Sequence, residues 1–215
     1  MTFQSAAILD GLHPESFRQL GILDSDVRES VDTALTNTSC IGSYNWSESE
    51  QYAKPVIVVP GAPRRWLNLS APFEVASGPA AYMNENAFRL PDMPLLPLIA
   101  AVDASGSQVD WPALDFVTDR GNLRRLLQWV SGGFNSKPER IDLQLVGDHT
   151  VLMNRWDPKA ICHTQSVNFG RGFESTASAP AKKGYSSYYQ ILKYELGGLR
   201  MVVRCEADAY LPAPS

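Results

Sequence analysis

Two acidic residues near the end of the sequence, Glu206 and Asp208, follow the largely apolar run of residues 198–205. Such a run, opened by glycines, predicts a β-strand. Side chains alternate faces along a strand, so the two carboxylates would point the same way. Their Cα atoms would lie about 7 Å apart, from a rise of about 3.3 Å per residue, and the pair could share a divalent cation such as Mg²⁺. The alternative is a strand end whose acids simply face water.

Other kinds of site have little support in the sequence. The three histidines stand in unrelated contexts, and the three cysteines are widely spaced with no Cys-x-x-Cys pair, so we expect no zinc site. No Gly-x-Ser-x-Gly motif supports acyl transfer. We expect the glycine pairs to form turns and not phosphate-binding loops, which require a preceding strand and a following helix.

Composition narrows the class of protein. The 215 residues are 44% apolar and 20% charged, which is ordinary for a globular domain. The net charge of −4 argues against a broad nucleic-acid-binding face. We expect a cytoplasmic protein with no membrane contact, because no signal-like N-terminus and no run of 18 apolar residues occurs.

The elements that must position the acids alternate between strands and helices. We expect a helix ending near Leu35, a strand at 55–60, ordered loop at 68–97, a helix at 95–102, a strand at 116–117 followed by a helix with an apolar stripe, hairpins at 141–156 and 185–208, and a glycine-rich bend at 168–172. This order predicts an α+β fold, a curved mixed or antiparallel sheet flanked by a few helices. We expect a single domain over 1–215, with an N-terminal extension at 1–40 and the core at 41–215.

Three islands in chain order resemble motifs of the DXO-type decapping exonucleases, a branch of the PD-(D/E)XK nuclease superfamily. They read Asp115-Phe-Val-Thr-Asp-Arg-Gly-Asn-Leu, Phe169-Gly-Arg-Gly-Phe-Glu and Arg204-Cys-Glu-Ala-Asp-Ala-Tyr. The resemblance implies a degenerate DXO-like nuclease fold, with Arg120 on an RNA phosphate and a metal site at Glu174, Glu206 and Asp208.

The sequence is also similar to fungal proteins often labelled geranylgeranyl pyrophosphate synthetases, through Ser43-Tyr-Asn-Trp and residues 58–66. That label fits poorly, because no Asp-Asp-x-x-Asp pair is present to bind a diphosphate through Mg²⁺.

The nuclease pattern is incomplete in this sequence. In the family, a Glu-x-Lys strand follows the Glu-x-Asp strand, whereas here Ser215 stands seven residues after Asp208. The one acid-x-Lys tripeptide, Asp157-Pro-Lys159, precedes two of the three islands. We therefore expect a disabled nuclease centre without a resident cofactor, in which Arg120 pairs with one of the carboxylates.

The leading functional hypothesis is a small-molecule enzyme of fungal secondary metabolism. We expect cofactor-free cyclisation or isomerisation of an apolar, terpenoid-sized substrate, of the pericyclase or Diels–Alderase kind, by orientation and polarisation of a carbonyl. The catalytic candidates are Arg120, Glu174, Glu206 and Asp208. The candidate substrate-binding aromatics, expected to line an apolar pocket, are Trp46, Trp66, Phe173, Tyr189 and Tyr210.

Two alternatives stay open. One is a Mg²⁺-dependent RNA 5′-end decapping enzyme or exonuclease, with the three carboxylates on the metal and Arg120 on phosphate. The other is a binding protein without catalysis, as a homodimer or paired with another chain that supplies the missing strands.

Overall fold

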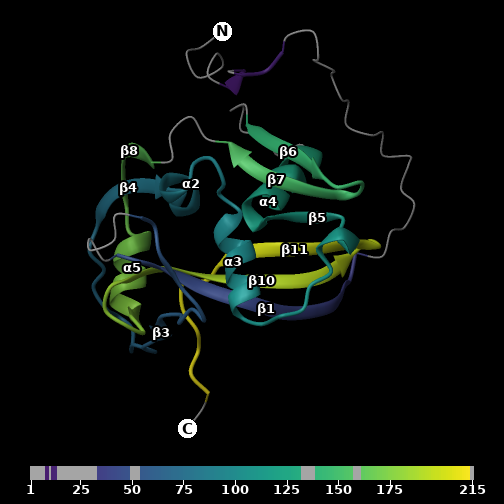
Figure 1. The fold of residues 1–215 in the computed structure, drawn as a ribbon. Helices are drawn as coiled ribbons and strands as arrows, with labels where there is room; N and C mark the ends of the chain where they lie inside the picture. Colours follow the sequence, from purple (N-terminus) through teal and green to yellow (C-terminus); the bar gives the residue numbers. More distant parts are fainter. Residues whose placement is uncertain are drawn as a thin grey trace. The chain divides into compact units, whose positions relative to one another are not determined.

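The computed structural model describes residues 8–9, 11–13, 33–48, 54–131, 139–156 and 161–213, with the backbone alone described at 79–83 and 161–167. Its elements (Figure 1) are β1 (Leu35–Ser47), β2 (Ile57–Val58), β3 (Arg65–Trp66), β4 (Gly78–Met83), α2 (Glu85–Arg89), α3 (Leu96–Ala104), η2 (Trp111–Ala113), β5 (Phe116–Asp119), α4 (Arg120–Val130), β6 (Arg140–Val146), β7 (Thr150–Trp156), β8 (Ile161–Asn168), α5 (Gly170–Ala177), β9 (Ser178–Ala179), β10 (Tyr185–Leu196) and β11 (Leu199–Glu206).

The strands form one large sheet and two small ones. The large sheet has seven strands in the order β2-β1-β10-β11-β5-β7-β6, and β3 pairs with β9 and β4 with β8 in two-stranded sheets. β1 pairs with β2, β3 with β9, β4 with β8 and β6 with β7 in antiparallel fashion, and β5 pairs with β7 in parallel. The expected α+β class, a mostly antiparallel sheet with a few helices, is therefore confirmed.

By its internal contacts the chain divides into two compact units. The first contains Met1–Thr38, Asp110–Pro158 and Tyr194–Val202, and the second contains Ser39–Val109, Lys159–Lys193 and Val203–Ser215. The long strands β1, β10 and β11 contribute residues to both units. The single-domain boundary expected from the sequence stays a prediction.

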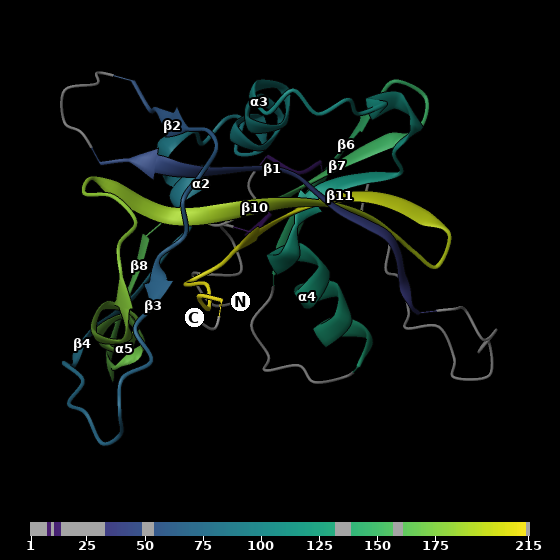
Figure 2. The ribbon, with the colours of Figure 1, turned by 90° about the horizontal axis from the view of Figure 1, so that it is seen from below.

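The first unit is built on β5, β6 and β7, with α4 in contact with β5 and β7. Asn122 in α4 is fully buried, and its amide nitrogen donates to the Met153 carbonyl oxygen at 2.9 Å. The expected apolar stripe of α4 is exposed at its far end, where Leu127 keeps 68% of its surface and Val130 58%. Figure 2 shows the reason: α4 starts at the strands of this unit and runs away from them.

The second unit has its core around α3 and the inner faces of β1, β10 and β11. Leu98, Ala101 and Val102 of α3 are buried, as are Tyr44 and Ile191 on the strands. The helix lies close to the sheet because β1 has a glycine there: a Cβ on Gly42 would stand 3.3 Å from the Ala101 carbonyl oxygen. Close backbone approach of this kind favours glycine.

Both hairpins predicted from the sequence are confirmed. β6 and β7 pair in register from Arg140 opposite Trp156 to Val146 opposite Thr150. β10 and β11 are joined by Gly197 and Gly198, whose φ angles of 57° and 82° are positive. Two successive positive φ values are typical of the type I′ turn, which explains why glycines stand there. The strand and helix expected at 116–130, and the helix expected near 95–102, are also present.

Three local predictions are wrong. The segment expected as loop at 68–97 contains β4 and α2, whose first turn is capped by the Asn84 side chain accepting from the Ala87 amide at 3.2 Å. Leu35 starts β1 instead of ending a helix, and the rest of that predicted helix lies outside the described residues. The glycine-rich bend at 168–172 leads directly into a helix, α5.

The glycines of α5 have a packing reason. A Cβ on Gly172 would stand 1.8 Å from the Ala76 carbonyl oxygen, so only glycine lets the helix lie against that loop. α5 also contacts β9, which pairs with β3 (Figure 2). None of the helices in the described ranges is long and apolar enough to cross a bilayer.

Candidate functional site

The three predicted catalytic carboxylates all belong to the second unit. Glu174 lies on α5, Glu206 ends β11, and Asp208 follows two residues later. Burial raises the pKa of the Glu174 carboxyl, and the negative charges of Asp208 and then Glu206 raise it further. The guanidinium groups of Arg171 and Arg64 lower the same pKa, but their effect is weaker.

The backbone conformation explains why Glu206 and Asp208 both raise the pKa of Glu174. The chain stays extended beyond the end of β11, because the Ala207 amide donates to the Tyr188 carbonyl oxygen at 3.1 Å. Side chains two residues apart then share a face. Glu174, Glu206 and Asp208 all remain exposed to solvent, so a ligand can reach them.

An aromatic surface adjoins Glu174. The Phe173 ring centroid lies 5.7 Å from that of Trp66 and 6.0 Å from that of Phe73. Phe173 keeps 41% of its surface exposed, whereas Trp66 and Phe73 are half-buried. Two predicted substrate-binding residues, Trp66 and Phe173, are thus in mutual contact beside the carboxylates.

Arg64 holds the loop between β2 and β3 against the end of α5. Its Nε donates to Ser178 Oγ at 2.7 Å, and its Nη2 donates to the Ser178 carbonyl oxygen at 2.9 Å. Because the guanidinium also acts on Glu174, Arg64 fixes a positive charge at one side of the carboxylates. Arg64 was not among the site residues predicted from the sequence.

Trp46 and Tyr189, also predicted to bind substrate, lie in the core of the second unit. Trp46 is 1% and Tyr189 6% exposed. The Trp46 indole and the Tyr44 hydroxyl both donate to Asn86 Oδ1, at 3.1 and 2.6 Å. Tyr189 stacks on Tyr44 with ring centroids 5.0 Å apart, and burial followed by the Glu206 charge raises the pKa of the Tyr189 phenol. Their role toward a substrate stays a prediction.

Arg204, which is 2% exposed, was not predicted from the sequence as a site residue. Its Nη1 donates to the Tyr44 hydroxyl and to the Pro94 carbonyl oxygen, each at 2.9 Å, and its guanidinium lies 5.7 Å from the centre of the Tyr189 ring. One signal was available: Arg204 stands two residues before Glu206 in the same strand, so it shares the face of the acids.

The last two predicted residues differ in their unit: Tyr210 belongs to the second unit with the carboxylates, and Arg120 does not. Tyr210 is 45% exposed, and its backbone is held by Trp66, whose amide donates to Tyr210, and by Arg64, whose carbonyl accepts from it, each at 2.9 Å. Arg120 is exposed at the start of α4 and belongs to the first unit, whereas the three carboxylates belong to the second. The pairing expected for Arg120 stays a prediction.

A metal ion is implied by the family resemblance, and the three carboxylates are its expected ligands. Across the described ranges, no group of three or more histidine, cysteine, aspartate or glutamate side chains is gathered closely enough to hold a metal ion. As placed, the three carboxylates do not fit a resident Mg²⁺, and we derive no reaction step through a metal.

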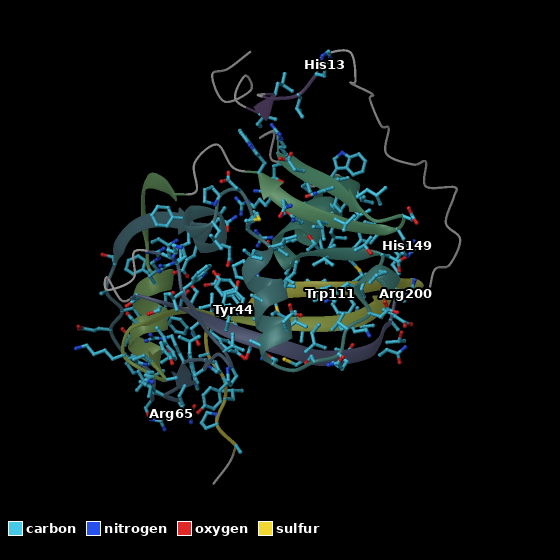
Figure 3. All side chains as sticks on the ribbon, viewed as in Figure 1. His13, Tyr44, Arg65, Trp111, His149 and Arg200 are labelled. Carbon is cyan, nitrogen blue, oxygen red and sulfur yellow. The ribbon has the colours of Figure 1, made fainter. Side chains whose placement is uncertain are left out.

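The first unit contains another polar cluster that the sequence did not reveal. Asp115 Oδ1 lies 2.7 Å from His149 Nε2, and Asp115 Oδ2 accepts from the Arg200 backbone amide at 2.7 Å. The Arg200 side chain lies 3.4 Å from Asp115 and 3.3 Å from the His149 ring nitrogen (Figure 3). The bond from the Arg200 amide is the main cause that lowers the pKa of Asp115.

Comparison with known proteins shows a family and a fold. Residues 18–214 match the family described as Domain of unknown function (DUF8563). No curated protein matches. Among solved structures, S. pombe Rai1 is similar with a TM-score of 0.53 at 12% identity, and its complex with 3'-FADP with 0.53 at 11%. A mutant of the same protein with 3'-FADP gives 0.52 at 12%.

These likenesses cover 87% of this chain and 57% of the Rai1 chain, so the chain spans less than two thirds of the length of that neighbour. At such identity they show the fold alone. The DXO-like fold expected from the sequence is confirmed in that sense.

Proposed function

The chain belongs to the DUF8563 family, and we propose that it is a small-molecule enzyme, a cyclase or isomerase in which the Glu174 carboxyl transfers a proton. The substrate we propose is an apolar, terpenoid-sized molecule with one oxygen or a reactive double bond. The DXO-like fold is compatible with an enzyme but does not by itself select a reaction.

The observation that carries the proposal is the raised pKa of Glu174 in a place that substrate can reach. A carboxylic acid that keeps its proton nearer to neutral pH is a better proton donor under working conditions. Burial and the two neighbouring carboxylates supply that shift. Perturbed acids of this kind are concentrated in functional sites.

The neighbouring groups fit the steps of such a reaction. Protonated Glu174 gives its proton to a substrate oxygen or double bond, and positive charge develops on the substrate carbon. Phe173 precedes Glu174 in α5 and contacts Trp66, and these two rings can stabilise that charge through their π systems. Loss of a proton from a neighbouring carbon to the Glu174 carboxylate restores the enzyme, and the product is an isomer of the substrate.

The test is turnover of linear polyenes that carry a carbonyl, followed by chromatography with mass detection. We expect a product of unchanged mass and altered retention. Glu174→Gln should abolish it, because the amide cannot donate an acidic proton, and chelation with EDTA should leave it intact. Glu74→Gln, which changes an exposed acid of the same unit, is the matched control and should retain turnover. Full activity in Glu174→Gln, or loss of activity on chelation, would contradict the proposal.

The Mg²⁺-dependent RNA 5′-end hydrolase stays a prediction from the sequence resemblance. Its support is the DXO-like fold and the grouping of Glu174, Glu206 and Asp208. Release of nucleotides from 5′-phosphorylated RNA with Mg²⁺, abolished by Asp208→Ala, would favour it over the isomerase.

A further inference from the structure

A groove of about 580 Å³ lies in the second unit, formed by the turn before β3, by the start of the segment after β9, and by Tyr210. Its apolar walls include Ala62, Pro63 and Pro180, and its side chains with polar groups are Arg65 and Tyr210. Small-molecule sites combine apolar walls with a few placed polar groups in this way.

The charge in the groove comes from Arg65, at β3 (Figure 3). Neighbouring side chains of an extended segment point to opposite faces. Arg64 is bonded to Ser178 and acts on Glu174, so Arg65 is directed away from these groups. Arg65 is exposed, and within the described part of the chain its guanidinium makes no ion pair. An arginine without a carboxylate partner is suited to bind an anion through two parallel N–H donors.

The walls of the groove are held by hydrogen bonds of the Asn45 side chain and by strand pairing. Ala62 donates its amide to Asn45 Oδ1 at 2.6 Å, and the Asn45 side chain donates to the Ser186 carbonyl oxygen at 3.1 Å. Gly61 lies against the Tyr44 backbone so closely that a Cβ would stand 2.6 Å from it. Arg65 is paired with Ala179 across the small β3–β9 sheet. A site fixed in this way loses little conformational entropy when a ligand binds.

We propose that this groove binds a small organic anion with a flat apolar body, whose carboxylate or phosphate pairs with Arg65 and whose body lies on Tyr210 and the proline walls. This site is separate from the Glu174 carboxyl in its residues. The two proposals can therefore succeed or fail independently.

Titration calorimetry of the full chain with 2-naphthoate, 2-naphthyl phosphate and neutral 2-naphthol tests the proposal. We expect both anions to bind at least about tenfold more tightly than the naphthol, because a single charged hydrogen-bonded contact contributes on that scale. Tighter binding of the phosphate ester identifies phosphate as the preferred group, and tighter binding of 2-naphthoate identifies carboxylate.

Variants locate the binding. Arg65→Gln should reduce the affinity for the anions to that for the naphthol, and Ala181→Trp, which fills the mouth of the groove, should abolish binding of all three probes. Arg124→Gln changes an exposed arginine of α4 and is the matched control, with unchanged affinity; Glu174→Gln should also leave the affinity unchanged. Equal binding of naphthol and anions, or anion affinity unaffected by both Arg65→Gln and Ala181→Trp, would overturn the proposal.

Discussion

Asp115 and Glu174 are two acids in different electrostatic surroundings. Asp115, in the first unit, accepts from the Arg200 amide and faces His149 and the Arg200 guanidinium, and its pKa is lowered. Glu174, in the second unit, is partly desolvated beside Asp208 and Glu206, and its pKa is raised. The same functional group is thus kept charged in one region and pushed toward its neutral form in the other.

We use this difference to assign a structural role to Asp115 and to propose a functional role for Glu174. Ion pairing and hydrogen bonds to the charged form, as at Asp115, stabilise the fold. A carboxyl group placed among like charges costs folding free energy, and proteins keep such arrangements mainly where chemistry uses them. This contrast is the reason that we place proton transfer at Glu174 and not at the Asp115–His149 pair.

The largest effect should come from removing Asp115, whose carboxylate contacts both Arg200 and His149. Asp115→Ala leaves the Arg200 amide without its acceptor and should lower the free energy of unfolding by about 1–3 kcal/mol. Chemical denaturation at neutral pH measures this, with Asp103→Ala, at an exposed position of α3, as the control. A loss no larger than in the control would show that the Asp115 cluster does not stabilise the fold.

The loss of stability in Asp115→Ala should depend on pH, because the pKa of Asp115 is lowered in the folded protein. Because the pKa of Asp115 is lower in the folded protein than in the unfolded chain, its contribution is present above the ordinary carboxyl pKa and disappears as the pH falls through the lowered value. The difference in stability between wild type and Asp115→Ala should therefore shrink in acid.

Glu174→Gln should act in the opposite direction. A raised folded-state pKa means that the charged form is disfavoured, so the amide should stabilise the protein at neutral pH. The expected gain is a few tenths of a kcal/mol, since the group is exposed and screened by solvent. The gain should vanish below the ordinary carboxyl pKa, where Glu174 is protonated in both states; thermal melts at several pH values check this. A destabilised Glu174→Gln protein at neutral pH would contradict the contrast with Asp115.

The smallest effect should be the change in the pKa of Asp115 caused by Arg200→Gln. The main cause of the lowered pKa is the Arg200 backbone amide, which the substitution keeps, and the side chain contributes less. Titration of the Asp115 carboxyl by NMR should therefore show only a partial return toward the ordinary value. A complete return would mean that the guanidinium, not the amide, holds the charge.

The sequence predicted the parts of the fold that local patterns specify. The glycine pair at 197–198 and the alternation at 141–156 predicted both hairpins, and the apolar periodicity after Asp119 predicted α4. The residues 168–172 were misassigned because glycines favour a turn locally. Here Gly172 allows the close contact of α5 with Ala76, which lies far away in the sequence.

The candidate site shows the same limit. The spacing of Glu206 and Asp208 predicted their common face, and the family motif pointed to Glu174. The roles of Arg64, Arg204 and Asn86 depend on partners distant in the sequence, Ser178, Tyr44 and Trp46 among them. No local pattern identifies such partners, and for the same reason Trp46 and Tyr189, predicted to bind substrate, lie in the core.

The most direct test of the account is an NMR titration of the Glu174 side-chain carboxyl in the wild-type chain and in the Glu206→Gln/Asp208→Asn double variant. We predict a pKa above the ordinary glutamate value in the wild type, and a lower pKa in the double variant, because two of the three causes that raise it are removed. An ordinary or depressed wild-type pKa, or one unchanged by the double substitution, would contradict the claim that the neighbouring carboxylates keep the proton on Glu174.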